Sequence, residues 1–346
     1  MRLLIDKANL IKVARLANKS LRQDALLTMQ TQFDVEFNFT EQESAQEAAT
    51  DEILGFWLQE FSELKGRNNR HDYVQPGDTP FILQENTRDT WQKHHTAFLI
   101  EQPAELIHRY QQAKELMIYG LGEEAQFFTT VFLGYPSRES HRGMLIGKEG
   151  FRQWNDLRPY VTPLTDLVLI DRYIGNDNSL LASNLFSIVR LFHANKQGRT
   201  NIILLTDKRE LAKGGHSPKS LQKKIKEEIA DIPGCTAKVT VVCWSSDTRQ
   251  NRQQYPEIKR FEEHDRTLVT NYTRWKSGDS FNYFDSQNRR ITSGRSMDIF
   301  SLAKRDNLAE AQDLLNDIND YLQWCKSSNP DNIVGDRSSR LLNIPR

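Results

Sequence analysis

Three short apolar runs separated by two stretches of helical periodicity limit the folds open to this chain. The runs are Leu167–Ile174, Asn201–Leu205 and Val239–Trp244. Between the first two, apolar side chains recur at helical spacing, and before the third Ser217 and Pro218 form a helix-start signal. Strand–helix–strand–helix–strand order predicts parallel strands with the helices packed on the sheet, which is an α/β fold.

Further elements extend this pattern toward both ends of the chain. We predict strands at Leu116–Gly120, Phe127–Leu133, Thr267–Thr270 and Asn282–Phe284, and a closing helix over Asp306–Cys325. Hydrogen-bonded pairing of these strands with the parallel ones gives a mixed sheet. The sequence therefore predicts a mixed-sheet α/β sandwich over residues 111–330, followed by a C-terminal tail over 331–346.

Residues 1–110 show a weaker pattern. Arg2–Asp6 and the alternating segment Asp34–Thr40 predict two strands. Thr40 and Glu43 have the spacing of a capping box and predict a helix that continues to Leu64. We expect a smaller N-terminal α+β module, and the sequence assigns it no role.

Charge is distributed unevenly between these two parts. The 346 residues include 46 Lys+Arg and 46 Asp+Glu, which argues against a basic coat over the whole protein. Residues 1–110 hold 12 basic and 17 acidic side chains, and the remainder holds 34 and 29. The basic surplus lies in the second part, so a local anion-binding groove stays open there.

Cysteine usage and hydropathy indicate a cytoplasmic protein. Cys235, Cys243 and Cys325 are too few for a disulfide framework and lack zinc-ligand spacing, so we expect buried, inert thiols. No run reaches the roughly 18 apolar residues of a transmembrane helix. Asp6 and Lys7 interrupt the N-terminal apolar stretch, which argues against a signal peptide. The sequence predicts no metal and no cofactor.

The most informative polar residues follow one another between His264 and Asn282. His264 and Arg266 are two apart, so on a strand they point to the same side, and Asn271 follows them. After a glycine turn, Ser280 and Asn282 are again two apart. An imidazole, a guanidinium, a hydroxyl and amides on neighbouring strands suit a phosphate group, because Arg supplies a fixed fork of donors.

This segment resembles the phospholipase D superfamily motif, His-x-Lys-(x4)-Asp-(x6)-Gly-Ser-x-Asn. His264, Arg266, Asn271 and Gly278 occupy the His, Lys, Asp and Gly places, and Ser280 and Asn282 follow one residue late. A closer resemblance is to a degenerate branch, the C-terminal phospholipase D-like domain of microtubule-interacting-and-transport (MIT) proteins and its bacterial relatives. Three patterns of that branch have counterparts here: His-Asp-Arg at His264, Phe-Asn-Tyr-Phe at Phe281 and Asp-x-Tyr-Ile at Asp171. The resemblance spans about residues 155–326.

The resemblance implies two kinds of function. In active superfamily members the His attacks phosphorus, the Lys holds phosphate, the Asp supports the His, and two motifs face each other. This chain has one motif, and the neutral amide of Asn271 cannot stabilise an imidazolium as a carboxylate does. The degenerate branch implies a dimerising binding or assembly module for a phosphate-bearing or protein partner. Its bacterial relatives often sit within multi-gene cassettes, including defence systems, so the resemblance also implies an accessory role in a larger assembly.

A basic stretch after the second predicted strand is a secondary signal. Its candidate groove residues are Lys208, Arg209, Lys213, Lys219 and Lys223. A solvated helix face is the common reason for such a charge pattern. Placed at the same sheet edge as His264, these cations would instead frame an anion groove, for nucleic acid or another phosphate ligand.

Two functions from different classes remain. The favoured one is a non-catalytic binding module, with a homodimer or another protein as partner. The alternative is a dimeric, metal-independent phosphodiesterase or nuclease with His264 as the nucleophile. A surface ion-pair cluster is the simplest reading of His264-Asp265-Arg266 alone, and it would contribute little to stability.

Overall fold

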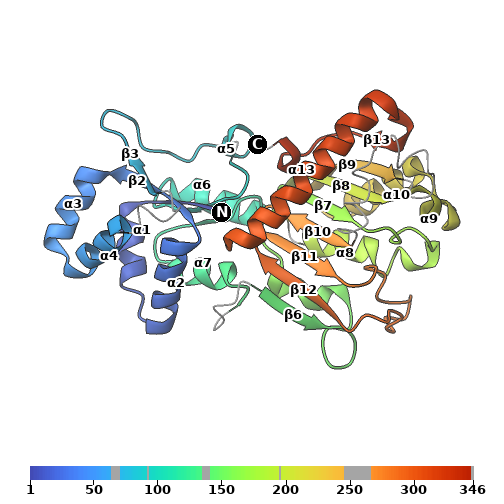
Figure 1. The fold of residues 1–346 in the computed structure, drawn as a ribbon, viewed down its shortest axis with the longest axis horizontal. Coiled ribbons are helices and arrows are strands. Elements are labelled where there is room, and N and C mark those ends of the chain that lie inside the picture. The colour runs from blue at the N-terminus through green and yellow to red at the C-terminus, as the bar shows by residue number, and fades with distance from the viewer. Residues whose placement is uncertain (64–70, 92, 135–140, 195, 245–265, 344–346) are drawn as a thin grey trace. The chain divides into compact units, whose positions relative to one another are not determined.

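The computed structural model describes residues 1–63, 71–91, 93–134, 141–194, 196–244 and 266–343 (Figure 1). The chain divides into two compact units. Unit 1 comprises residues 1–140 and 301–308, and unit 2 comprises residues 141–300 and 309–346. Each unit is built around its own sheet.

Unit 1 contains a five-stranded sheet in the order β3-β2-β1-β4-β5, with every pair parallel. The strands are β1 (Arg2–Ile5), β2 (Asp34–Thr40), β3 (His71–Val74), β4 (Thr96–Leu99) and β5 (Ile118–Tyr119). The helices are α1 (Lys7–Ala14), α2 (Lys19–Thr31), α3 (Glu41–Thr50), α4 (Glu52–Glu63), α5 (Thr87–Thr90), α6 (Ala104–Ala113) and α7 (Glu124–Val131). Parallel neighbours need crossover connections, which these helices supply, so unit 1 is α/β rather than the α+β module predicted.

The predicted capping box is present at the start of α3. Thr40 Oγ1 accepts a hydrogen bond from Glu43 N at 3.2 Å, and Glu43 Oε2 accepts one from Thr40 N at 2.8 Å. The helix predicted to reach Leu64 is divided at Asp51, whose carboxylate accepts from Ile53 N at 3.0 Å and so begins α4. An Asp that bonds the backbone two residues ahead ends one helix and starts the next.

The predicted boundary at residue 110 differs from the structure. β5 pairs with β4, and α7 packs on β5, so residues 111–134 belong to unit 1. The strand predicted over Phe127–Leu133 is wrong, because this segment lies largely in α7. Phe127, Phe128 and Val131 are buried there. A short, continuously apolar run cannot be assigned to a strand or a helix by periodicity alone.

Unit 2 contains an eight-stranded mixed sheet in the order β13-β9-β8-β7-β10-β11-β12-β6. β7, β8 and β9 are parallel to one another, and β10 is antiparallel to β7. The strands are β6 (His141–Leu145), β7 (Asp166–Ile170), β8 (Gly198–Asp207), β9 (Cys235–Trp244), β10 (Thr267–Thr270), β11 (Thr273–Ser277), β12 (Ser296–Ser301) and β13 (Ile333–Gly335). The helices are α8 (Leu185–His193), α9 (Lys208–Lys213), α10 (Pro218–Ala230) and α13 (Arg305–Ser328), with 3-10 turns η1 (Trp154–Tyr160), η2 (Asn178–Leu180), η3 (Pro330–Asn332) and η4 (Leu341–Asn343).

This arrangement confirms the α/β class. β7 is buried at every residue, as expected for a parallel strand covered on both faces. The crossovers through α8 and α10 run in the same direction across the sheet, and these two helices pack on each other. Figure 1 shows α13 running across the strands, and its Tyr321 hydroxyl donates to the Cys243 carbonyl at 2.9 Å. The helices thus enclose the sheet that positions the candidate site.

Local signals account for several element ends in unit 2. The side chain of Ser217 accepts from Ser220 N at 3.1 Å, and Pro218 occupies the first position of α10, as predicted. β10 has the predicted bounds. The predicted strand Asn282–Phe284 is absent from the sheet, and only an isolated bridge joins Phe284 to Arg290. The predicted tail includes β13, which pairs with β9 and therefore belongs to unit 2.

The three cysteines are free and buried, as the sequence predicted. Burial raises the pKa of Cys243 to about 12 and that of Cys325 to about 11, and it also raises the pKa of Cys235. A thiol that stays protonated is neither a nucleophile nor a metal ligand. Within the described residues, no helix combines the length and the apolar character needed to cross a membrane.

These thiols should resist modification in the folded protein. With Ellman's reagent at pH 8, we expect almost no reaction from the native chain and full reaction of all three cysteines after denaturation. A Ser286→Cys variant, which places a thiol on an exposed turn, supplies the reactive control. Rapid modification of the native wild-type protein would contradict the buried placement.

His193 should make stability depend on pH. Its Nδ1 donates to the Val189 carbonyl at 2.7 Å, and burial lowers its pKa to about 4. Because the folded pKa lies below the unfolded value, the stabilising contribution is present above pH 6.5 and is lost as pH falls toward 4. We expect a loss of about 2 kcal/mol between pH 7 and 5 that His193→Phe removes, measured by urea unfolding. Parallel pH profiles of the two proteins would exclude this role.

Candidate functional site

The carboxyl ends of the parallel strands of unit 2 form one edge of its sheet. β7 ends beside Asp171 and Arg172, β8 ends at Asp207, and β10 begins at this edge because it runs antiparallel to β7. Arg266 comes immediately before β10. In open α/β sheets, ligands bind outside the carboxyl ends of the strands, so we call this the carboxyl edge and take it as the candidate site.

Asp171 is the fully buried acceptor at the centre of this edge. Its carboxylate accepts from Ser280 Oγ at 2.9 Å, from Phe281 N at 2.7 Å and from Tyr173 N at 2.8 Å. These donors come from two segments that are about a hundred residues apart in the chain. A buried carboxylate is tolerated only with such hydrogen bonds, so Asp171 fixes segment 280–281 at the end of β7.

Asn282 connects the same segment to the loop after β7. Its Nδ2 donates to the Tyr173 carbonyl at 2.8 Å and to Asn176 Oδ1 at 3.3 Å, and the side chain is buried. Its Oδ1 has no hydrogen-bond partner within the part of the chain that the structure describes. Asn282 therefore holds the loop and keeps one acceptor at the edge.

Arg266 enters the edge through an uncommon backbone conformation. Its φ is +73°, and its N donates to the Ile170 carbonyl at 2.8 Å, while its own carbonyl accepts from Ser277 N at 3.1 Å. Its Nη1 lies 3.4 Å from the Gly278 carbonyl. A non-glycine residue in the left-handed region is often part of a functional site, since the surrounding structure must hold it there.

The predicted set therefore converges only in part. Arg266, Ser280 and Asn282 lie at the carboxyl edge, two of them bonded to the end of β7 and its loop. Asn271 does not: it follows β10 at the other end, about 16 Å from Arg266 for five extended residues. His264 lies outside the described residues, so its position relative to Arg266 stays a prediction.

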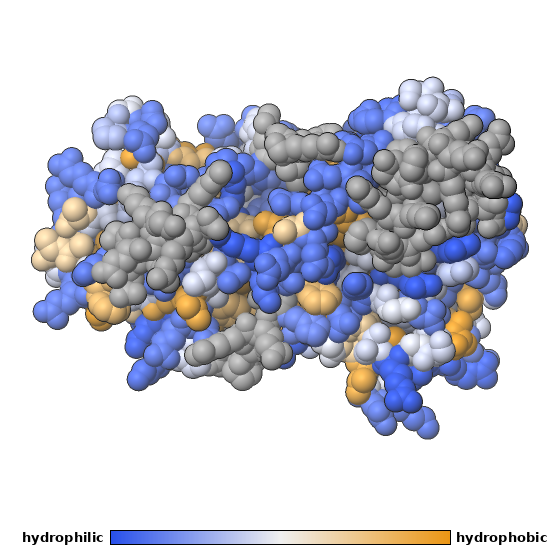
Figure 2. Space-filling view, viewed as in Figure 1, coloured by the Kyte–Doolittle hydropathy of each residue, from blue (hydrophilic) through white to orange (hydrophobic). Residues whose placement is uncertain are grey.

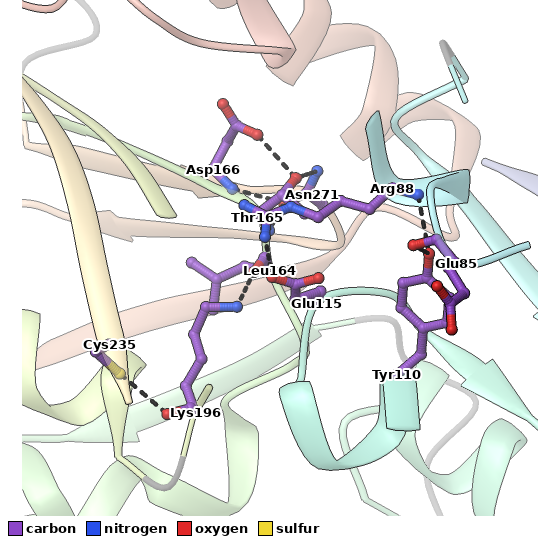
Figure 3. Close-up of polar contacts among 10 residues, drawn as sticks. All are labelled: Glu85, Arg88, Tyr110, Glu115, Leu164, Thr165, Asp166, Lys196, Cys235 and Asn271. Atoms are coloured by element: carbon purple, nitrogen blue, oxygen red, sulfur yellow. Dashed lines mark hydrogen bonds and ion pairs between the residues drawn. The ribbon is translucent and has the colours of Figure 1, made fainter. Parts of the chain in front are cut away.

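Asn271 instead accepts hydrogen bonds at the start of β7, as Figure 3 shows. Its Oδ1 accepts from Thr165 N at 2.8 Å and from Asp166 N at 3.1 Å, at the start of β7. Asp166 is itself buried and accepts from Arg340 N at 2.7 Å. The prediction that Asn271 joins the phosphate set is wrong, because its amide organises the opposite edge of the sheet.

Two further cations lie at the carboxyl edge. Arg172 Nε lies 3.8 Å from Asp207 Oδ2, and Lys208 Nζ lies 3.3 Å from Asn332 Oδ1. Asp207 also accepts from Arg209 N at 2.8 Å and so caps α9. Arg172 and Asp207 were not among the predicted site residues, and the signal that could have found them is their place directly after apolar strands.

Several residues of the predicted basic groove are engaged locally, in ion pairs or along α10. Lys213 pairs with Glu210 of its own helix at 2.6 Å, and Lys223 pairs with Glu227 of α10 at 3.5 Å. Lys219 and Lys223 line a hollow along α10 of about 680 Å³. Among the five predicted groove residues, Lys208 and Arg209 follow β8 directly and so lie at the carboxyl edge.

Loop contacts bring the segment before α10 close to this edge. A Cβ at Gly214 would lie 2.1 Å from the Gly175 carbonyl oxygen, so only glycine allows this approach. The neighbouring His216 is buried, and burial, with a smaller effect from Lys224, lowers its pKa. This ring is therefore neutral near pH 7. Among the described residues, no group of His, Cys, Asp and Glu is arranged to hold a metal ion.

Comparison of the chain with known protein families finds no match, and no curated protein shows significant sequence similarity to it.

Replacing Asp171 should destabilise unit 2. Asp171→Asn removes the charge that three donors share and places an amide NH₂ against them. We expect a loss of about 2–4 kcal/mol in the free energy of unfolding, measured by urea titration. Asp231→Asn, at the exposed C-terminus of α10, is the matched control and should change stability by less than about 0.5 kcal/mol. Equal effects of the two substitutions would contradict the central role of Asp171.

Proposed function

We propose that unit 2 is a degenerate phospholipase D-like binding module that takes a phosphate-bearing ligand at its carboxyl edge without hydrolysing it. The observation that supports this proposal most is the charge balance there. Arg172, Lys208 and Arg266 come to one edge, where Asp171 and Asp207 accept hydrogen bonds from backbone and hydroxyl groups and Asp207 also lies 3.8 Å from Arg172 Nε. Three cations against two carboxylates leave a positive surplus at the end of the sheet, which favours an anion.

The hydrogen bonds at the edge favour binding over catalysis. Ser280 donates its hydroxyl to Asp171, and Asn271 serves the backbone at the far end of β7. Neither residue is placed to assist attack by an imidazole at the carboxyl edge. In this proposal the module acts in the cytoplasm as a homodimer or with a protein partner. Resemblance to the bacterial relatives suggests a defence system as its setting.

Small phosphate ligands test the proposal directly. We expect bis(p-nitrophenyl) phosphate and inorganic phosphate to bind the full chain, and Arg266→Ala to weaken binding about 10-fold or more, measured by calorimetric titration. Arg266→Lys should have an intermediate effect, because it keeps the charge and loses the planar fork. Arg190→Ala, which removes an exposed arginine on α8, should bind as the wild type does.

Two outcomes would contradict this function. If Arg266→Ala binds both ligands with wild-type affinity, the carboxyl edge is not the site. If p-nitrophenol is released in the presence of a chelator and His264→Ala abolishes that release, the protein is the alternative phosphodiesterase and the non-catalytic proposal fails.

A further inference from the structure

A second, strongly basic surface lies in unit 2 outside the predicted site. A hollow of about 850 Å³ opens between the turn after β6 and the turn before β12. The charged residues that line it are Lys148, Glu149, Arg152, Arg289, Arg290 and Arg295, five cations and one anion. We call it the basic hollow. In Figure 2, strongly hydrophilic side chains gather over the ends of β6 and β12.

The turn after β6 has a fixed backbone. Gly147 N donates to the Phe151 carbonyl at 2.8 Å, and Phe151 N donates to the Leu145 carbonyl at 2.9 Å. Gly147 has φ +101°, and a Cβ at Gly150 would lie 1.9 Å from the Leu145 carbonyl oxygen. Both glycines are therefore required, and they hold the turn that carries Lys148 and Arg152.

The turn before β12 is fixed in a similar way. The carboxylate of Asp285 accepts from Gln287 N at 2.8 Å, from Arg289 N at 2.9 Å and from Arg289 Nε at 2.7 Å. Arg290 joins the two turns, because its Nη1 donates to the Ile146 carbonyl at 3.3 Å and its Nε donates to the Thr292 carbonyl at 3.1 Å. The hollow is thus preformed, which lowers the entropy cost of binding.

Three of its cations are available to a ligand. Lys148, Arg152 and Arg295 are exposed, and among the described residues their side chains make no hydrogen bond or ion pair. Of the lining residues that the structure describes, Glu149 is the one acidic side chain. An anion that binds here gains charge-assisted hydrogen bonds without first breaking ion pairs of these three side chains.

The surroundings of the hollow indicate a polymer with several phosphates. Asp279 accepts from Thr292 Oγ1 at 2.7 Å and from Ser280 N at 2.9 Å, so one braced segment connects the hollow to the carboxyl edge. Burial raises the pKa of Asp279, but hydrogen bonds from these donors outweigh it and lower the pKa below its usual value. The Asp279 carboxyl is therefore ionised near pH 7. The carboxyl edge and the basic hollow would then be two anion sites on one segment. Such a pair suits a polymeric ligand that carries a phosphate in each repeat unit.

Three features favour the backbone of duplex nucleic acid over other polyanions. Arginines outnumber lysines in the lining four to one, and the guanidinium fork matches phosphodiester oxygens. Among the described residues no aromatic side chain lines the hollow, so this lining offers no platform for unstacked bases. The exposed apolar side chains beside it are Leu145 and Ile291, whereas membrane-binding loops typically use Trp or Phe.

We infer that the basic hollow binds the phosphodiester backbone of a nucleic-acid duplex. This inference rests on the proposed phosphate-binding role of unit 2 and names the ligand class. Contacts of this kind are independent of base sequence, because the hollow offers donors to phosphates and nothing that reads base edges.

Salt-dependent binding tests the inference. We would titrate the full chain into a fluorescein-labelled DNA duplex of about 20 base pairs and follow anisotropy at several salt concentrations. The triple variant Lys148→Ala, Arg152→Ala, Arg295→Ala should bind about 10-fold or more weakly, and its slope of log affinity against log salt should be smaller by about 2.7, or about 0.9 for each cation. The control triple Arg190→Ala, Lys238→Ala, Lys326→Ala removes the same charge from unit 2 outside the hollow and should retain the wild-type slope.

The inference fails if the wild-type protein does not bind the duplex, or if both triple variants lose the same amount of duplex affinity. Binding of the wild type to phosphatidylserine vesicles but not to duplex, lost in the hollow variant, would also overturn it and assign the surface to membranes. If Arg266→Ala loses the small phosphate ligands while the hollow variant binds duplex normally, the inference alone fails. If small phosphates do not bind and the hollow variant still loses duplex, the proposed function alone fails.

Discussion

The buried carboxylate of Asp171 is the interaction on which the carboxyl edge depends. A charge without exposure must be compensated by donors, and here they come from Tyr173, Ser280 and Phe281. This requirement draws the segment after β11 across the end of β7. It also fixes the turn at Gly278 beside Arg266. The hydrogen bonds that compensate the Asp171 carboxylate therefore also determine where the Arg266 guanidinium lies.

The segment after β11, which Asp171 holds at the end of β7, continues to the basic hollow. Asp279 joins Ser280 to Thr292, and Arg290 ties the following turn to the backbone after β6. Behind these contacts, Trp154 and Tyr283 stack with ring centroids 5.0 Å apart, and Asn184 Oδ1 accepts from Tyr283 N at 2.8 Å. The segment between β11 and β12 has little regular structure, yet side-chain hydrogen bonds and aromatic packing hold it.

Sequence patterns predicted the core of unit 2 well, because each signal there is local. The cap at Ser217, the bounds of β10 and the periodic face of α13 need only neighbouring residues to be recognised. Asn271 was misassigned because spacing in the chain was read as proximity, although five residues of extended strand separate two ends of a sheet. Asp171 was missed as the centre of the edge, since its donors are about a hundred residues away in sequence. Unit 1 was harder to predict: β5 has only two residues, and the apolar run in α7 has no clear period.

The central claim is that the carboxyl edge of unit 2 binds phosphate through arginines placed there by the Asp171 network. NMR of the arginine side-chain Nε–Hε groups, with inorganic phosphate added to the full chain, tests it most directly. The account predicts saturable shifts of the Arg266 and Arg172 signals, with amide shifts at Ser280 and Asn282 that follow the same binding curve. Saturable shifts confined to other arginines, with these signals unmoved, would contradict it.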